Sequence, residues 1–214
     1  MTGERIPEND SRSRQKRVGD ALRHDTRNRV LEAAEIEFTA NGYIATTVTR
    51  LAAAAGVSVQ TLYSAWGSKR ALLRGYMERT LAGGAASPED AAARFTDDLT
   101  PRQRLEELAD LFTEIADRAS TGWTLYRDAA AVDPEIADDW NDLQRLRHGL
   151  FTRIIGDIPT DALAPGLSRK TAVDTAWAIA SPETFDLLVG RRGYTPDELR
   201  AWLRRTLVGA ILGR

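Results

Sequence analysis

The feature that most constrains this chain is the stretch of residues 46–69, which reads TTVTRLAAAAGVSVQTLYSAWGSK. Two short segments with helical apolar spacing flank Gly56, and hydroxyl residues that can cap a helix precede each of them. Ala52 is small where two helices would approach closely, Gly56 supplies the positive φ of a tight turn, and Leu62 can lock the second helix onto the first. This spacing predicts a helix-turn-helix, the unit that places a recognition helix in the DNA major groove.

Caps and glycines predict four helices in the first part of the chain. Their approximate ranges are 26–41, 47–55, 59–65 and 69–81. Asn41-Gly42 supplies the left-handed stop of the first helix. The caps of the other three are Thr46 or Thr47, Ser58, and Ser68.

The rest of the chain is also helical by its apolar spacing, and no alternating strand pattern competes with it. The predicted helices cover about 102–119, 123–132, 134–155, 168–180, 182–189, and a last one that starts at Thr195-Pro196. In the range 134–155, one apolar face comprises Trp140, Leu143, Leu146, Leu150, Phe151 and Ile154. The fold class is therefore all-α.

Composition shifts divide the chain into three parts. Residues 1–22 are polar and charged and are expected to form a disordered basic arm, either a solvated tail or a DNA contact. Residues 23–83 form the predicted DNA-binding domain, with the helix-turn-helix at 46–65. A Gly83-Gly84 boundary separates it from a larger helical regulatory and dimerisation domain at 84–214.

The distribution of charge agrees with this division. Residues 1–79 carry 13 Lys and Arg against 9 Asp and Glu, whereas residues 80–214 carry 16 against 22. Uneven surface charge would give the same numbers, but a basic front part is typical of a protein that contacts nucleic acid there.

Other function classes find little support in the composition. The chain has no cysteine and only two histidines, so disulfides and zinc sites built from Cys and His are excluded. No apolar run is long enough to span a bilayer, and a cytoplasmic protein without membrane contact is expected. The carboxylate pairs Glu106-Glu107 and Asp138-Asp139 are adjacent and so point around a helix, which argues against an enzyme. No cofactor or metal is expected.

The predicted recognition helix offers short polar side chains and one phenol. Gln60 can bind adenine through a bidentate pair, and Tyr63 can donate its hydroxyl to a phosphate. Lys69 lies in the first turn of the fourth helix, where its ammonium and free N–H groups can bind phosphate together. The complete set of expected DNA contacts is Thr46, Thr47, Ser58, Val59, Gln60, Thr61, Tyr63, Ser64 and Lys69.

Residues 33–73 resemble the TetR-type bacterial transcriptional regulators. The shared features are Asn41-Gly42-Tyr43, Thr46-Thr47, Ala52 with Gly56-Val57-Ser58, Thr61-Leu62-Tyr63, and Trp66-Gly67-Ser68-Lys69. Trp66 stands where that family usually has phenylalanine, and Ser64-Ala65 replaces a bulkier pair. The resemblance implies a sequence-specific regulator, released from its operator by a small molecule.

The same resemblance implies a homodimer that binds a palindromic double-stranded operator. Its last helices, about 168–213, would pair with those of a second copy. The apolar residues Leu199, Trp202, Leu203, Leu207 and Ile211 fit such a face, although they also fit an intramolecular core. Two recognition helices would then meet major-groove faces about 34 Å apart.

Family members commonly bind an effector in the helical C-terminal domain, and the sequence does not identify that small molecule. The aromatic residues available for such a pocket are Phe112, Trp123, Tyr126, Trp140, Phe151 and Trp177, which core packing would also explain. A repressor is the leading interpretation. A transcriptional activator on the same fold, an all-α enzyme and a protein-docking module are the alternatives.

Overall fold

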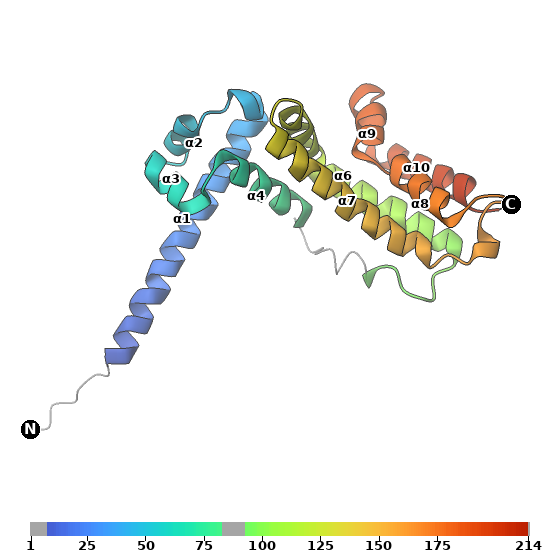
Figure 1. The fold of residues 1–214 in the computed structure, drawn as a ribbon, viewed down its shortest axis with the longest axis horizontal. Coiled ribbons are helices and arrows are strands. Elements are labelled where there is room, and N and C mark those ends of the chain that lie inside the picture. The colour runs from blue at the N-terminus through green and yellow to red at the C-terminus, as the bar shows by residue number, and fades with distance from the viewer. Residues whose placement is uncertain (1–7, 83–92, 214) are drawn as a thin grey trace, which may run out of the picture. The chain divides into compact units, whose positions relative to one another are not determined.

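The computed structural model describes residues 8–82 and 93–213, which form helices and no strand apart from one isolated bridge (Figure 1). Contacts divide the chain into two compact units, residues 1–76 and 77–214. The all-α prediction is confirmed. The predicted boundary at Gly83-Gly84 lies outside the described residues. None of the described helices is long and apolar enough to cross a membrane.

The first unit is built from α1 (Glu8–Ala45), α2 (Val48–Ala54), α3 (Val59–Trp66) and the start of α4 (Lys69–Ala82). Gly42 interrupts α1 with a φ of 74°, as the Asn-Gly stop predicts. The centre of this unit is closed by fully buried side chains from all four helices, namely Val30, Phe38, Leu51, Leu62 and Leu72.

Helix α1 is longer than the sequence predicts. Residues 8–22, expected to be disordered, are helical and continue directly into the packed part of α1 from Val30 onward (Figure 1). Extending a stable helix avoids the unfavourable nucleation step, so a polar segment becomes helical once its neighbour is fixed. Arg23 and Asp20 add an exposed ion pair three residues apart.

The second unit contains four main helices, α6 (Pro101–Ala130), α7 (Pro134–Gly156), α8 (Arg169–Ile179) and α10 (Pro196–Ile211). Short elements connect them: η1 (Thr160–Ala162), α9 (Pro182–Phe185) and a π-helical turn, η2 (Asp186–Arg191). Helix α6 packs against α7 and α10, and α8 packs against the same two helices. The four therefore enclose one core.

Helix α6 replaces the two helices predicted at 102–119 and 123–132. Gly122 falls between these two predicted ranges, and in the structure it is buried in an uninterrupted helix. A Cβ at Gly122 would lie 3.2 Å from Met77 Cε, so the glycine allows a close approach of side chains. A glycine in a helical pattern can thus mark tight packing as well as a helix end.

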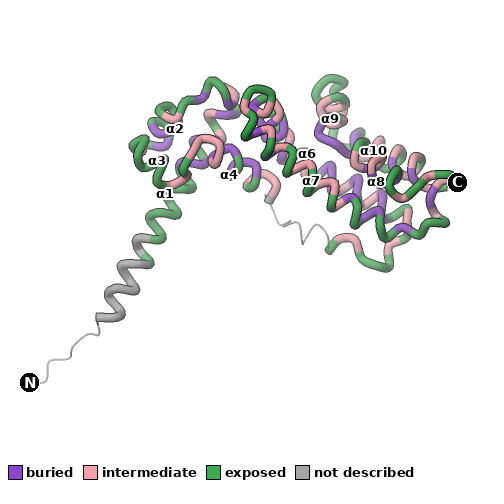
Figure 2. Tube along the Cα trace, in the orientation of Figure 1, coloured by how far each residue is buried: buried purple, intermediate pink, exposed green. Residues whose placement is uncertain are grey.

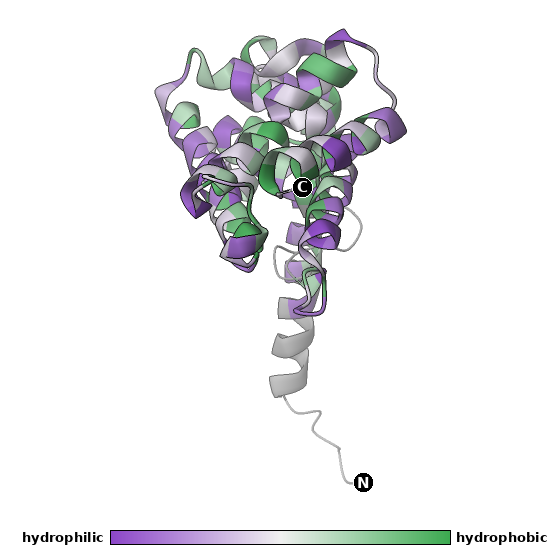
Figure 3. Ribbon diagram, turned by 90° about the vertical axis from the view of Figure 1, so that its right-hand side faces the viewer, coloured by the Kyte–Doolittle hydropathy of each residue, from purple (hydrophilic) through white to green (hydrophobic). Residues whose placement is uncertain are grey.

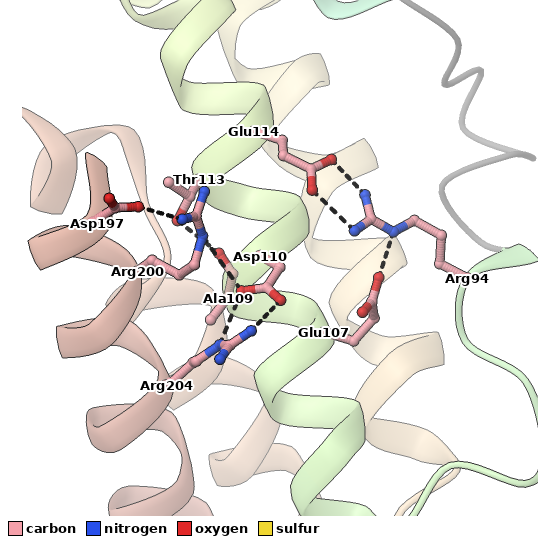
Figure 4. A network of polar contacts seen from close by, with 9 residues as sticks. All are labelled: Arg94, Glu107, Ala109, Asp110, Thr113, Glu114, Asp197, Arg200 and Arg204. Carbon is pink, nitrogen blue, oxygen red and sulfur yellow. Dashed lines mark hydrogen bonds and ion pairs between the residues drawn. The ribbon is translucent and has the colours of Figure 1, made fainter.

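Charged side chains hold α10 and the segment at Arg94 to opposite sides of α6 (Figure 4). Arg204 donates two hydrogen bonds to the carboxylate of Asp110, a bidentate pair. Arg94 donates to Glu107 and Glu114, and the hydrogen bond from Arg94 holds the pKa of Glu114 below its ordinary value. These pairs fix the outer faces of the bundle.

The apolar residues of α10 face the interior of their own unit. Leu199, Leu203, Leu207 and Ile211 are all 0 % exposed, and only Trp202 of the predicted face is partly exposed. Buried positions recur along α10 between exposed ones (Figure 2). Of the two alternatives that the sequence left open for these residues, a dimer face or an intramolecular core, the structure shows the core. Colouring by hydropathy likewise shows hydrophilic residues along the outward sides of the helices (Figure 3).

The predicted apolar face of α7 is divided in the structure. Phe151 and Ile154 are buried, together with Ile136 and Ile155, but Leu146 is 72 % exposed. Leu143 and Leu150 are only partly covered. The neighbouring helices therefore cover only part of the apolar face that the spacing predicts for α7.

Candidate nucleic-acid interface

The turn between α2 and α3 has the geometry that the Ala-Gly-Leu spacing predicts. Gly56 adopts a φ of 64°, and the N–H of Val57 donates to the carbonyl of Ala52 at 3.0 Å. Ala52 and Leu62 are 2 % and 0 % exposed, so they form the contact between the two helices. The turn is therefore held by one backbone hydrogen bond and lies between helices that each bury an apolar side chain.

Hydroxyl caps fix both helix starts. The Oγ1 of Thr47 accepts from the N–H of Arg50 at 3.2 Å, which decides between the two threonines proposed as the cap of α2. The Oγ of Ser58 accepts from the N–H of Thr61 at 3.0 Å. Ser58 therefore fixes the first turn of α3, the helix that the sequence predicts as the recognition helix.

Helix α3 has one buried and one exposed side. Leu62 points into the unit, whereas Tyr63 is 47 % exposed and Val59 is 37 % exposed. The remaining side chains expected to contact DNA from α3 and its cap are also exposed, namely Ser58, Gln60, Thr61 and Ser64. Thr47 is exposed at the start of α2. The residues of α3 and its cap thus share one exposed helical segment, and Thr47 lies on the neighbouring helix.

Thr46 lies elsewhere. It is 0 % exposed, and its hydroxyl donates to the carbonyls of Gly42 and Glu37 at 2.7 and 3.1 Å. A side chain enclosed in this way is not available to a phosphate. Thr46 thus secures the segment after the Gly42 break, and the exposed surface begins at Thr47.

Lys69 also has a structural role that the sequence does not reveal. Its ammonium donates to the carbonyls of Tyr43 and Thr46 at 2.9 and 3.0 Å and lies 4.0 Å from the centroid of the Tyr43 ring. It therefore ties the start of α4 to the segment that precedes α2. A contact from Lys69 to phosphate would have to coexist with these bonds.

We expect Lys69→Met to lower the free energy of unfolding by about 1–3 kcal/mol, because two carbonyl groups lose a charged donor. This should appear as a fall of several degrees in the thermal midpoint, measured by circular dichroism. Lys170→Met is the matched control, since the Lys170 side chain is 86 % exposed and its ammonium forms an exposed ion pair with Asp174. An equal midpoint for both variants would contradict the structural role of Lys69.

Two arginines of this unit were not singled out from the sequence. Arg50 pairs with Glu37 across α2 and α1. Arg27, on α1, donates to the carbonyl of Ala65 in the last turn of α3. Both contacts join residues 13 or more positions apart. No local pattern in the sequence marks them.

The six aromatic residues proposed for an effector pocket fall into three sets of contacts. Phe112 and Trp123 stack with ring centroids 5.8 Å apart, and Phe185 contacts Trp123 edge to face at 6.3 Å. Tyr126 stacks on Trp140 at 6.2 Å. Phe112, Trp123, Tyr126 and Phe151 are each less than 10 % exposed. Most of them therefore serve the core in this structure.

Phe151 and Trp177 belong to a separate cluster around Arg147. The guanidinium of Arg147 lies 4.8 Å from the Trp177 ring centroid and donates to the carbonyls of Trp177 and Ala180 at the end of α8. Burial lowers the pKa of Arg147 to about 10. Because it stays charged at neutral pH, Arg147 complements the C-terminal end of α8.

A shallow pocket of about 200 Å³ lies between α6 and the α9–η2 segment. Of the six aromatic residues proposed for an effector pocket, Trp123 lines this pocket, together with Phe185, Arg127 and Asp186. Arg127 and Asp186 approach within 3.9 Å across it. Aromatic and charged groups of this kind could orient a small organic ligand.

Comparison with known proteins agrees with the helix-turn-helix geometry. Residues 30–76 match the sequence profile of bacterial regulatory proteins of the tetR family. This range covers the packed part of α1, all of α2 and α3, and the first half of α4. Among curated proteins, none matches the chain significantly.

Solved structures share the fold over nearly the whole chain. NalD, the secondary repressor of the MexAB-OprM multidrug efflux pump in Pseudomonas aeruginosa, is 20 % identical, with a TM-score of 0.67, over 88 % of this chain and 96 % of NalD. A second similar structure is a transcriptional regulator from Saccharomonospora viridis in complex with choline. It is 20 % identical to this chain, with a TM-score of 0.70, and the match covers 89 % of this chain and 100 % of the regulator. A TetR-like regulator from Rhodococcus sp. RHA1 is 18 % identical, with a TM-score of 0.62, over 95 % and 96 %.

Proposed function

We propose that this chain, which belongs to the TetR family of bacterial regulatory proteins, is a homodimeric repressor that a small molecule releases from a palindromic operator. The observation that carries the proposal is the exposed side of α3, where short polar side chains and Tyr63 face outward from a capped helix. We expect the protein to act in the cytoplasm, where the DNA is.

The proposed DNA-binding surface combines one capped helix with its neighbours. Its residues are Thr47, Ser58, Val59, Gln60, Thr61, Tyr63 and Ser64, with Lys69 beside them. Short polar groups at the start of α3 suit base edges, while hydroxyls and free N–H groups at helix starts suit phosphates. A surface of this kind reads sequence through few contacts, so pairing two copies on one site would raise both affinity and specificity.

The proposed dimer uses the outer sides of α8 and α10, which pack against each other within the protomer. Both sides carry small exposed residues, including Ala178 on α8 and Ala201 and Gly209 on α10, with the exposed Arg205 between the last two. A Cβ at Gly209 would meet no atom within 4 Å. Such a surface allows close approach of a second copy, and an isologous pair would match a palindromic operator.

An effector site is proposed at the pocket between α6 and the α9–η2 segment. Its aromatic residues Trp123 and Phe185 and its charged residues Arg127 and Asp186 support a small organic ligand. The relative from Saccharomonospora viridis holds choline, which supports a small-molecule response in this fold. Ligand binding would act by favouring a state in which the two recognition helices no longer match the operator.

Selection from a random-sequence duplex library with the full-length protein tests the proposal. The expected product is a palindrome whose half-sites are about one helical turn apart, bound with an affinity that falls steeply as salt rises. Recovery of no sequence preference after repeated rounds would overturn a sequence-specific regulator. The selected duplex then serves as the probe for variants of the protein.

We expect Gln60→Ala to relax sequence preference rather than to weaken all binding equally. A bidentate pair to adenine supplies about 1–3 kcal/mol of discrimination, or roughly tenfold to more than a hundredfold. Competition binding with the selected duplex and with single-base variants of it measures this loss position by position. Equal losses on the selected duplex and on random DNA would contradict base reading by Gln60.

A further inference from the structure

The C-terminal end of the recognition helix α3 is held by a side chain from α1. Arg27 Nη1 donates to the carbonyl of Ala65 at 2.5 Å. The carbonyls in the last turn of a helix have no partner inside the helix, and a cation placed there is favoured by the helix dipole. Helix α3 has no basic residue of its own in its last turn, so Arg27 supplies that charge from α1.

Trp66 joins the same arrangement through its ring and its N–H group. The indole Nε1 donates to the backbone carbonyl of Arg27 at 3.1 Å, and the Arg27 guanidinium carbon lies 4.0 Å from the centroid of the indole. The two residues therefore link α1 and α3 at three points: a cation–π contact and one hydrogen bond in each direction. A phenyl ring at position 66 could not make the N–H bond.

Gly75 of helix α4 leaves room for this indole. A Cβ at Gly75 would lie 2.5 Å from Cζ3 and 2.6 Å from Cη2 of Trp66, closer than real side chains allow. Gly75 is buried, so the ring occupies the space that a side chain would take. The tryptophan is thus enclosed between Arg27 on one element and Gly75 on another.

We propose that Arg27 is a positioning residue for DNA recognition, which sets the pose of α3 by clamping Trp66 and the carbonyl of Ala65. An exposed arginine in the first helix of a DNA-binding unit would ordinarily be assigned to a phosphate. The contacts instead direct its guanidinium to α3. This proposal rests on the proposed function, because it concerns the pose of the helix that reads the operator.

The two roles of Arg27 differ in how binding depends on salt. A phosphate contact releases counterions, so its loss lowers the slope of log affinity against log salt by about 0.9. Loss of a positioning contact weakens specific binding at every salt concentration and leaves that slope unchanged. Lysine at this position could still reach a phosphate, but it lacks the planar fork that stacks and donates at once.

The experiment measures binding of full-length Arg27→Ala and Arg27→Lys to the selected duplex over a range of salt. Both variants are expected to bind about tenfold more weakly than the original protein, with an unchanged slope and a smaller loss on random DNA. Arg23→Ala is the matched control, since Arg23 lies one turn earlier on α1 and its side chain is 81 % exposed. Binding is measured well below each thermal midpoint, so that all variants are folded.

A double-mutant cycle with Trp66→Phe completes the test. The combined variant is expected to bind no more weakly than Arg27→Ala alone, because both changes break one arrangement. A slope lowered by about 0.9 with recovery in Arg27→Lys would overturn the proposal in favour of a phosphate contact. Unchanged affinity with a lower thermal midpoint would also overturn it. If Gln60→Ala still alters preference in that case, the proposed function stands and only the role of Arg27 fails.

Discussion

Replacing Gly75 by alanine is expected to destabilise the DNA-binding unit, even though alanine is the better helix former. The new methyl group would lie about 2.5 Å from the indole of Trp66, and the indole cannot withdraw without breaking its bonds to Arg27. Overpacking of this kind costs about 1–3 kcal/mol, whereas the gain in helix propensity is about 1 kcal/mol. We expect a net loss of up to about 2 kcal/mol in the free energy of unfolding.

A second substitution identifies the cause of this loss. Phenylalanine at position 66 lacks the distal ring atoms Cζ3 and Cη2, so Gly75→Ala should cost much less stability when it is made in the Trp66→Phe variant than when it is made in the original protein. Denaturant unfolding followed by circular dichroism measures each variant. Gly149→Ala on α7 is the matched control. A Cβ at position 149 would meet no atom within 4 Å, so this substitution should stabilise the helix by reducing the freedom of the unfolded chain. Equal behaviour of Gly75→Ala and Gly149→Ala would show that the ring has room to move.

Local signals explain which parts of the fold could be predicted from the sequence. Ser58, Ser168 and Thr195 each cap a helix that starts one residue later, as their neighbours along the chain indicate. Gly56 takes the positive φ that its turn demands. These features depend on groups within about four residues of one another, so they can be predicted from the local sequence.

Distant contacts explain what could not be predicted. Thr46 and Thr47 are adjacent and chemically identical, yet one is buried against the carbonyls of Glu37 and Gly42 and the other caps α2 in solvent. Lys69 bonds to carbonyl groups 23 and 26 residues earlier in the chain. A side chain that suits both phosphate and carbonyl gives no sign in the sequence of which partner it has. The exposed candidates on α3 remain proposals for DNA contacts.

Helix α10 shows the same limit on a larger scale. Its apolar periodicity correctly predicts one buried side, but periodicity does not say whether that side meets the same protomer or a second copy. The structure places it against α6 and α8. The opposite side, which includes Ala201 and Gly209, has small residues and no apolar periodicity, so the sequence does not mark it as an interface.

The two sides of α10 lead to opposite expected results for substitutions. Leu203→Ala should lower the free energy of unfolding by about 2–5 kcal/mol, because Leu203 is 0 % exposed in the protomer and its loss leaves a cavity. Ala201→Arg should leave the fold intact, since Ala201 is exposed, but should convert the proposed dimer to monomer by placing a large charge in its interface. Thermal melting measures the first effect, and sedimentation or light scattering at a fixed protein concentration measures the second.

The comparison between these variants locates the interface without knowledge of the operator. If Leu203→Ala yields a stable monomer and Ala201→Arg stays dimeric, the leucine side would be the interface and the packing of α10 against α6 and α8 would be wrong. The opposite result places the interface on the small-residue side. In that case Leu203→Ala melts at a lower temperature but keeps the mass of the original dimer, and Ala201→Arg has the mass of a monomer that is still folded. Operator binding by Ala201→Arg should then fall steeply, because a monomer contacts only one half-site and loses the advantage of bound pairs.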